Sequence, residues 1–178
     1  GLIYVTAIWG STFVMVKDSL GSINAVTLVG YRFTVAAFIM LIILLAMGKK
    51  PFEKIKNGIV LGVILWMMYV PQTLGLKYTK ASNSAFITGL FIVFVPLLAF
   101  ILHKEKPALN KLISVITALT GLWILTGGLK GVNIGDALTL VTAFACALHI
   151  MIAGKFVKES INPYVLNFQQ FITVGVLS

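Results

Sequence analysis

The sequence of 178 residues predicts an all-α fold, a polytopic bundle of transmembrane helices. Apolar residues make up 59% of the chain and charged residues 11%, whereas a typical soluble domain has about 25% charged residues. Several uncharged runs are as long as a membrane is wide, and the run Ala85–Leu102 holds 18 residues without an ionisable side chain. About 20 apolar residues of helix cross a hydrocarbon core about 30 Å thick. The runs are too long, and too uniformly apolar, to be the strands of a β-barrel.

Seven apolar segments follow one another along the chain. They are Leu2–Val16, Val26–Met47, Ile59–Leu76, Ala85–Leu102, Leu112–Thr126, Ala137–Ala153 and Tyr164–Leu177. The connections between them are short and hold turn-forming residues, at Gly21–Asn24, Gly48–Pro51, Thr79–Asn83 and Gly127–Gly128. Because these connections are short, neighbouring helices are expected to be antiparallel. The first segment looks shortened at its start, and the last runs to the end of the chain.

Lysines between the segments predict the orientation in the membrane. If the segments alternate in direction, nine lysines fall on one side and four on the other. The nine are Lys49, Lys50, Lys54, Lys56, Lys104, Lys106, Lys111, Lys155 and Lys158, and the four are Lys17, Lys77, Lys80 and Lys130. Cytoplasmic loops carry the excess of basic residues, so we expect a multi-pass protein of the cell (plasma) membrane with a cytoplasmic N-terminus. The net charge of +9 then reflects topology and lipid headgroups, not nucleic acid.

An internal repeat is visible at an offset of 138 residues. The tripeptide Ser-Ile-Asn precedes both the second and the seventh segment, ending at Asn24 and at Asn162. The same offset pairs Phe33 with Phe171, and it pairs the neighbouring positions 32 and 170. Five segments lie within this offset, and an odd number means that the two copies cross the membrane in opposite directions. Inverted repeats of this kind are typical of secondary transporters.

The repeat predicts two domains. Residues 1–127 would form a first repeat of five transmembrane helices, and residues 134–178 would be the start of a second, inverted repeat with two helices. The chain would then be truncated within the second repeat. The missing C-terminal helices of the same chain, on the order of 100 residues at about 20 residues per span, would complete a ten-helix protein.

The stretch Pro71–Thr88, which joins the third and fourth segments, is the most distinctive part of the sequence. Together with Trp9–Val14, Tyr31–Phe33, Pro96, His103–Pro107, Gly121 and Gly135–Ala137, it resembles the drug/metabolite transporter superfamily, specifically its EamA-type members. The resemblance implies ten helices in inverted five-helix repeats, a central cavity, and export or exchange of small metabolites. The family often has a Trp where this chain has Ala145–Ala147, so one cavity wall is expected to differ.

Two side chains inside the predicted spans carry or can carry a positive charge, Arg32 and His149. Arg32, the only arginine, lies about 9 Å below the start of its segment at about 1.5 Å per residue. It either reaches back to the outer headgroups, pairs with Asp18, or faces a cavity and binds an anionic group of the substrate. His149 either packs with a hydrogen-bond partner or takes part in binding a substrate or a proton.

Six further polar or aromatic residues inside the spans are candidates for a substrate-binding cavity. They are Trp9, Thr12, Trp66, Tyr69, Gln72 and Thr88. The Gln72 amide must find partners in a hydrocarbon environment, at a cavity wall or at a helix contact. Gly58 and Gly62, spaced four apart, predict a close contact between helices. Pro71 and Pro96 each free a backbone carbonyl, which either bends a helix around a cavity or forms a packing kink.

No catalytic or metal site can be assembled from the sequence, and no cofactor is expected. The five acidic residues lie in loops or at helix ends, Cys146 is alone in an apolar run, and no Ser-His-Asp set or paired carboxylates occur. We therefore predict a transporter of small organic metabolites, an exporter or exchanger acting by alternating access, with a small-molecule substrate and the lipid bilayer as partners. A channel or facilitator for small solutes is the alternative, although no filter motif is visible, and a membrane-embedded enzyme is disfavoured.

Overall fold

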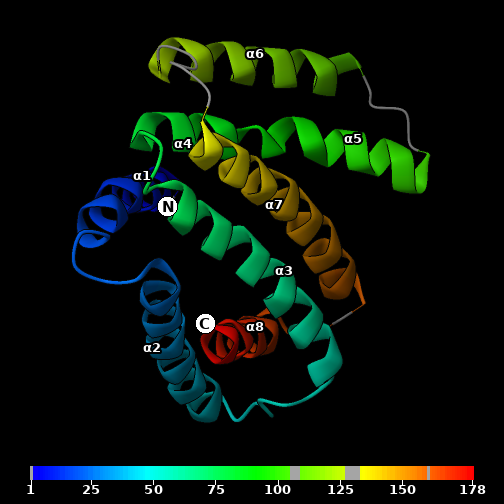
Figure 1. Ribbon diagram of the computed structural model, residues 1–178. Coiled ribbons are helices and arrows are strands. Elements are labelled where there is room, and N and C mark those ends of the chain that lie inside the picture. Colours follow the sequence, from blue (N-terminus) through cyan, green and yellow to red (C-terminus); the bar gives the residue numbers. More distant parts are fainter. Residues whose placement is uncertain (1, 105–108, 127–132, 160) are drawn as a thin grey trace.

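The computed structural model describes residues 2–104, 109–126, 133–159 and 161–178, and every regular element in these residues is an α-helix. The helices are α1 (Leu2–Ser19), α2 (Ala25–Ala46), α3 (Ile55–Gly75), α4 (Ala81–Gly89), α5 (Phe91–His103), α6 (Leu109–Thr126), α7 (Ile134–Lys158) and α8 (Pro163–Leu177). Figure 1 shows α3 and α7 side by side, α8 between α2 and α3, and α6 at one edge beside α5. The predicted all-α fold is confirmed.

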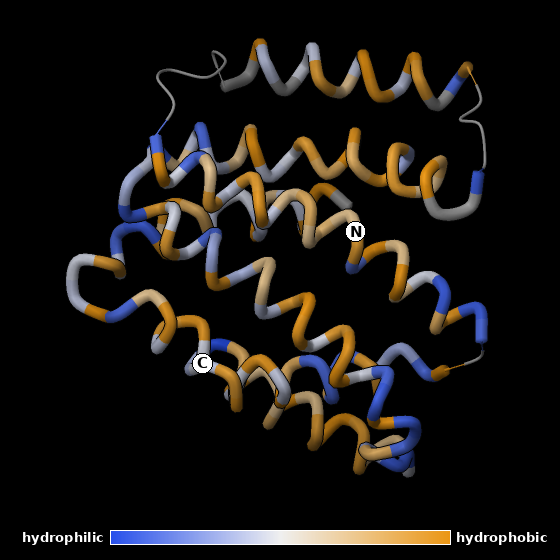
Figure 2. Tube along the Cα trace, turned by 45° about the vertical axis from the view of Figure 1, so that its right-hand side comes forward, coloured by the Kyte–Doolittle hydropathy of each residue, from blue (hydrophilic) through white to orange (hydrophobic). Residues whose placement is uncertain are grey.

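Four stretches of the described residues are long and apolar enough to cross a membrane. They are Ala25–Ala46, Ile55–Gly75, Ala81–Ile101, which joins α4 to α5, and Ile134–Lys158. In Figure 2 the helices are mostly orange, and blue gathers near helix ends and connections. Large apolar side chains also point outward, and on α2 the exposed fractions of Phe38 and Ile42 are 64% and 53%. Such surfaces suit lipid and not water, so the chain is a polytopic membrane protein.

Asparagine side chains fix where three of the helices begin. Asn24 accepts a hydrogen bond from the Val26 N–H at 2.9 Å before α2, and Asn162 accepts one from the Tyr164 N–H at 2.9 Å before α8. Asn133 and the Asp136 side chain form a capping box at the start of α7. These side chains satisfy backbone N–H groups that have no partner inside the first turn of a helix. The asparagine that ends each copy of the repeated tripeptide therefore caps the helix that follows it.

Helix α7 runs antiparallel to α3 and touches it closely along its length. At one end, a Cβ on Gly75 would overlap the carbonyl oxygen of Gly135, and a Cβ on Gly135 would overlap the carbonyl oxygen of Gly75. In the middle, the Thr142 hydroxyl donates to the Met68 carbonyl oxygen at 2.9 Å. The contact thus pairs the C-terminal end of α3 with the N-terminal end of α7, as the predicted alternation of directions requires.

Helix α8 runs parallel to α3 and depends on the two predicted glycines. A Cβ on Gly58 would overlap the Gln169 side chain, and a Cβ on Gly62 would overlap that of Thr173. The prediction that Gly58 and Gly62 permit a close helix contact is confirmed. Because α8 also packs along α2, it is wedged between α2 and α3.

The largest core cluster joins α2, α3, α7 and α8. Its buried members are Val29, Phe33, Ile64, Leu65, Met68, Val70, Ala145, Cys146 and Val174. The Phe33 ring lies edge-on to Tyr69, with centroids 4.8 Å apart, and 5.5 Å from the Phe171 ring. Cys146 is buried, as its place in an apolar run predicts. This aromatic chain connects α3 through α2 to α8.

The fourth apolar segment is interrupted, at a place that the sequence analysis did not foresee. Helix α4 ends at Gly89, Leu90 forms a turn, and α5 begins at Phe91. The expected kink was at Pro96, but Pro96 lies inside α5. Glycine has a low helix propensity, so the break falls at Gly89 before the proline is reached.

Several helices begin earlier than the apolar pattern predicts. Helix α3 starts at Ile55 instead of Ile59, and α4 starts at Ala81 instead of Ala85. The reason is that hydropathy marks only the part of a helix that is apolar, whereas the first turns here are polar. The predicted boundary after residue 127 lies outside the described residues, as do Lys106 and Lys130. The division into repeats stays a prediction.

The Gly75–Gly135 contact should not tolerate a side chain. We expect Gly75→Ala to lower the melting temperature of the full reading frame that contains this chain, because the new Cβ meets the Gly135 carbonyl and the cost of overpacking is about 1–3 kcal/mol. Gly154→Ala is the matched control, since no atom lies within 4 Å of the position that its Cβ would take and alanine favours a helix. Thermal unfolding in detergent, followed by size-exclusion chromatography, measures both variants. Equal melting temperatures would contradict the close packing of α3 and α7.

The predicted orientation can be checked by labelling. Lys54 and Lys158 lie at one end of the bundle, at the start of α3 and the end of α7, and Lys77 and Lys80 lie at the other end. In a Cys146→Ala background, we expect cysteines at the first two positions to be shielded from an impermeant thiol reagent in intact cells and those at the other two to react. The reversed pattern would overturn the cytoplasmic assignment of the N-terminus.

Candidate functional site

A small cavity lies between α1, α2 and α3. It is lined by Thr12, Phe13 and Val16 of α1, Arg32 of α2, and Tyr69, Gln72, Thr73 and Leu76 of α3. Its volume is about 10 Å³. This is room for about one water molecule. The structure therefore brings together four of the predicted site residues, Thr12, Arg32, Tyr69 and Gln72, in a closed space of mixed polarity.

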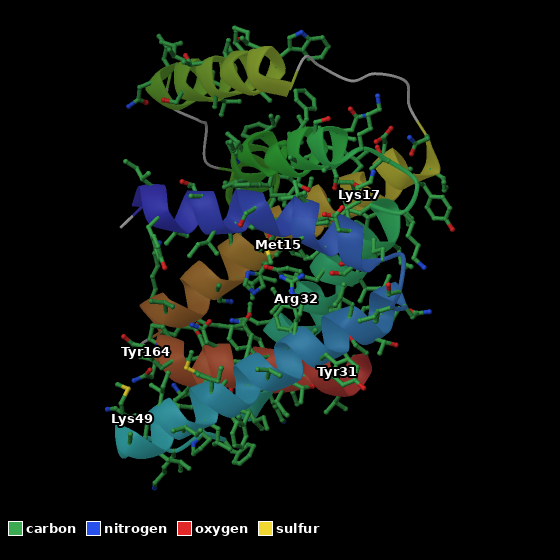
Figure 3. The ribbon with its side chains drawn as sticks, turned by 90° about the vertical axis from the view of Figure 1, so that its left-hand side faces the viewer. Met15, Lys17, Tyr31, Arg32, Lys49 and Tyr164 are labelled. Atoms are coloured by element: carbon green, nitrogen blue, oxygen red, sulfur yellow. The ribbon has the colours of Figure 1, made fainter. Side chains whose placement is uncertain are left out.

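The Arg32 guanidinium is half-buried beside this cavity. Its carbon atom Cζ lies 5.9 Å from the centre of the Tyr69 ring, within the range of a cation–π contact. In Figure 3 the Arg32 side chain lies between α1 and α2. Among the residues that the structure describes, no acidic side chain forms an ion pair with it, and Asp18 is exposed. The interpretation that Arg32 pairs with Asp18 is wrong, because the two form no ion pair in the structure and the Asp18 side chain is exposed.

A second, more open hollow adjoins the cavity. Trp9 and Thr88 line it, and Phe13 lines both spaces. The two spaces are also joined by a hydrogen bond, in which the Gln72 amide Nε2 donates to the Thr88 hydroxyl oxygen at 3.0 Å. Both side chains are buried, with exposed fractions of 8% and 4%. The amide that the sequence marked as needing a partner thus finds it on the neighbouring helix α4.

The threonines in the cavity use their hydroxyl hydrogens within their own helices. The Thr12 hydroxyl donates to the Trp9 carbonyl oxygen at 2.6 Å, and the Thr73 hydroxyl donates to the Tyr69 carbonyl oxygen at 2.7 Å. Their oxygen lone pairs are left as acceptors. The charged donor group that the cavity offers to a ligand is therefore the Arg32 guanidinium.

His149 and Trp66 lie away from both spaces. The His149 ring atom Nε2 is 2.7 Å from the Gln170 oxygen Oε1, and the Gln170 Nε2 donates to the Asn167 Oδ1 at 2.6 Å. With the Gln170 amide in this orientation, its oxygen accepts and His149 carries the proton on Nε2. Trp66 packs on the main core, and its Nε1–H is buried without a partner among the described residues.

A buried polar cluster at the end of the bundle that holds Lys77 and Lys80 was not predicted as a unit. The Thr79 hydroxyl donates to the Asp136 carboxylate, whose other oxygen accepts the Asn133 N–H at 3.0 Å. The exposed fraction of Asp136 is 3%. Lys17 donates to the Thr79 carbonyl oxygen, so the cluster ties the end of α1 and the turn before α4 to the start of α7. The sequence indicated Asp136 only as an acidic helix end, because its partner is 57 residues away.

Gln169 forms the corresponding link at the other end of the bundle. Its exposed fraction is 1%, and its Nε2 donates to the carbonyl oxygens of Pro51 at 2.9 Å and Glu53 at 2.7 Å. Helix α8 is thereby fastened to the connection between α2 and α3. No sequence signal pointed to Gln169, since one glutamine in an apolar helix has many possible partners.

The described residues do not bring three His, Cys, Asp or Glu side chains together as a metal site would require.

The chain was also compared with known proteins. The model of the EamA-like transporter family matches residues 1–127. The chain belongs to this family.

Two relatives show how much of an EamA-like transporter the chain represents. It is 33% identical to an uncharacterized transporter of Archaeoglobus fulgidus over all of this chain and 55% of that protein. It is also 33% identical to the uncharacterized transporter YyaM of Bacillus subtilis, over 84% of this chain and 53% of that protein. The chain thus spans about half the length of the curated relatives it matches. No solved structure matches it significantly.

The predicted site residues of this EamA-like chain fall into three groups. Thr12, Arg32, Tyr69 and Gln72 line the closed cavity, Trp9 and Thr88 line the adjoining hollow, and Trp66 and His149 lie elsewhere. The apolar lining residues Phe13, Val16 and Leu76 were not predicted, because in an apolar helix they do not differ from core residues. The substrate-binding roles of the eight predicted residues stay a prediction.

Replacing Asp136 should loosen the end of the bundle where α7 begins. In Asp136→Ala, the Thr79 hydroxyl and the Asn133 N–H lose their acceptor, and each buried unsatisfied group costs about 1–3 kcal/mol. We expect a clearly lower melting temperature of the full reading frame. Asp18→Ala, which removes an exposed carboxylate near the same end, is the control and should melt like the unaltered protein. Identical melting of the two variants would refute a structural role of the cluster.

Proposed function

We propose that the protein to which this chain belongs transports small organic metabolites across the plasma membrane, as an exporter or exchanger that works by alternating access. Membership in a family of membrane transporters, and not of enzymes, supports this function. The observation that carries the proposal is the group of polar side chains, Arg32, Gln72 and Thr88, held between helices whose outer faces are apolar. Ionisable groups inside membrane segments are costly and mark substrate or ion pathways.

The small size of the cavity supports a mechanism with moving helices. About 10 Å³ is too little for an organic solute, so a substrate that binds beside Arg32 requires the helices to separate. Two polar links lie at opposite ends, with Thr79 and Asp136 at one and Gln169 and the 51–53 carbonyls at the other. Each link joins residues of the predicted first repeat, 1–127, to residues of the predicted second repeat, 134–178. Opening one end while the other stays linked is the pattern that alternating access requires.

Contacts between α2 and α8 support the inverted repeat. The two helices are antiparallel, since Gly30 lies at Ser178, and Leu44 packs in a cluster with Val165 and Phe168. Equivalent residues near a two-fold axis should touch, and the Phe33 and Phe171 rings, which the offset pairs, are 5.5 Å apart. The predicted further helices of the second repeat would supply the wall that faces α1.

The function can be tested on the full reading frame, reconstituted in liposomes. A counterflow screen of small organic metabolites identifies a transported solute. We then expect Gln72→Leu, which removes the amide and leaves Thr88 unpaired, to reduce saturable transport roughly tenfold. The control is Thr117→Val on α6, an exposed threonine whose hydroxyl bonds only the Ile113 carbonyl of its own helix.

Size-exclusion chromatography of each variant separates a loss of transport from a loss of folded protein. If no solute is exchanged by the folded protein, the transporter proposal fails. Non-saturable flux without counterflow would indicate a channel and would overturn alternating access.

A further inference from the structure

The positive charge of Arg32 has no negative partner in the described part of the protein. The Arg32 side chain is half-buried, and among the described residues its guanidinium contacts the face of the Tyr69 ring. A cation–π contact offsets only part of the cost of holding a charge among apolar helices. An arginine in such a place normally has an acidic partner or a functional counter-ion.

The direction of the side chain argues against a role at the lipid surface. Arg32 lines the cavity together with Thr12 of α1 and Gln72 of α3, so it points into the bundle. In Figure 3 it lies between α1 and α2, whereas its neighbour Tyr31, 67% exposed, lies on the outside of α2. A snorkelling arginine would extend along the outer face towards the headgroups.

The hydrogen bonds already made around the cavity indicate which kind of ligand fits it. The hydroxyl hydrogens of Thr12 and Thr73 are used within their helices, and the Gln72 amide donates to Thr88. The guanidinium, with five N–H donors in a planar fork, is the charged donor that lines the cavity, and its geometry matches a carboxylate, whereas the second Gln72 N–H and the Tyr69 hydroxyl are neutral donors. Among the described residues, Arg32 is the cation that lines the cavity, which favours a ligand with one negative charge.

We propose that Arg32 binds the carboxylate of the transported solute, and that the substrates are small organic monoanions. This inference rests on the proposed transport function and adds the substrate class. Phe13, Val16 and Leu76 supply an apolar wall beside the guanidinium, which suits an organic body better than an inorganic anion. The carboxylate enters when α1 moves away from α2 and α3, because the closed cavity holds about one water molecule.

The test uses the full reading frame in phosphatidylcholine liposomes. Solutes found by counterflow are compared with a panel of small carboxylates and their primary amides, of which benzoate and benzamide are one pair. We expect the carboxylates and not the amides to compete for transport. Arg32→Gln should weaken that competition roughly tenfold or more, and Arg32→Lys should restore part of it, because it keeps the charge and loses the fork. Lys77→Gln, which removes an exposed cation at the same end, should change nothing.

The outcomes separate this inference from the proposed function. If solutes are transported but neutral compounds compete as well as carboxylates, or Arg32→Gln transports like the unaltered protein, the inference is overturned and the transporter stands. If no solute is transported by the folded protein, the proposed function fails, and the inference with it.

A second measurement needs no variant. Phenylglyoxal modifies arginine side chains, and mass spectrometry of the peptide that contains Arg32, the only arginine of this chain, follows the reaction. In detergent without phospholipid, benzoate should slow the modification and benzamide should not. Protection by phospholipid alone, with none by any carboxylate of the panel, would assign Arg32 to a headgroup phosphate and overturn the proposal.

Discussion

The close approach of α3 to α7 and α8 determines where the other parts of the structure lie. Three glycines on α3 make it possible, with Gly58 and Gly62 against α8 and Gly75 against α7. Backbones this near leave little freedom to rotate α3, so the face that remains is turned towards α1 and α2. That face presents Tyr69, Gln72 and neighbouring residues to the cavity. A packing contact on one side of a helix thus aims the polar side chains on the other, which is a general consequence of helix rigidity.

The second constraint is the absence of water from the surroundings of these helices. Pro71 has no N–H group, so it cannot donate a hydrogen bond to the carbonyl oxygen one turn earlier in α3. Next to that position, the Met68 carbonyl oxygen accepts a hydrogen bond from the Thr142 hydroxyl of α7. Gln72 with Thr88 and His149 with Gln170 follow the same rule, in that a polar group on one helix is satisfied by another helix. Polar side chains in this bundle therefore act as helix contacts. Arg32 differs from them because its hydrogen-bond donors are not used up.

The sequence predicted the features that depend on local pattern. Long apolar runs predicted the helices, and the spacing of Gly58 and Gly62 predicted a close contact that the structure contains. Polar character and depth within a segment made Gln72 and Arg32 candidates, and the structure places both at the small cavity, while their binding roles stay a prediction. The links made by Gln169 and Asp136 could not be predicted, because each partner lies far away in the chain and is chosen by tertiary packing. The break between α4 and α5 at Leu90 was not predicted, because Pro96 gave the stronger local signal for a kink.

Arg32 and Gln170 illustrate how the two halves could share one task unequally. The predicted offset relates their positions, yet Gln170 is already hydrogen-bonded to His149, whereas Arg32 has the Tyr69 ring as its described contact. At this pair of related positions in the proposed transporter, the charge of the substrate would then be held by Arg32 and not by Gln170. This asymmetry suits transport, because a solute must bind firmly enough to enter the site and loosely enough to leave it. A second guanidinium at position 170 would tighten the hold on a carboxylate and slow its release on the far side. The hydrogen bond between Gln170 and His149 thus leaves Arg32 as the charged group of this pair of positions, available to recognise the solute.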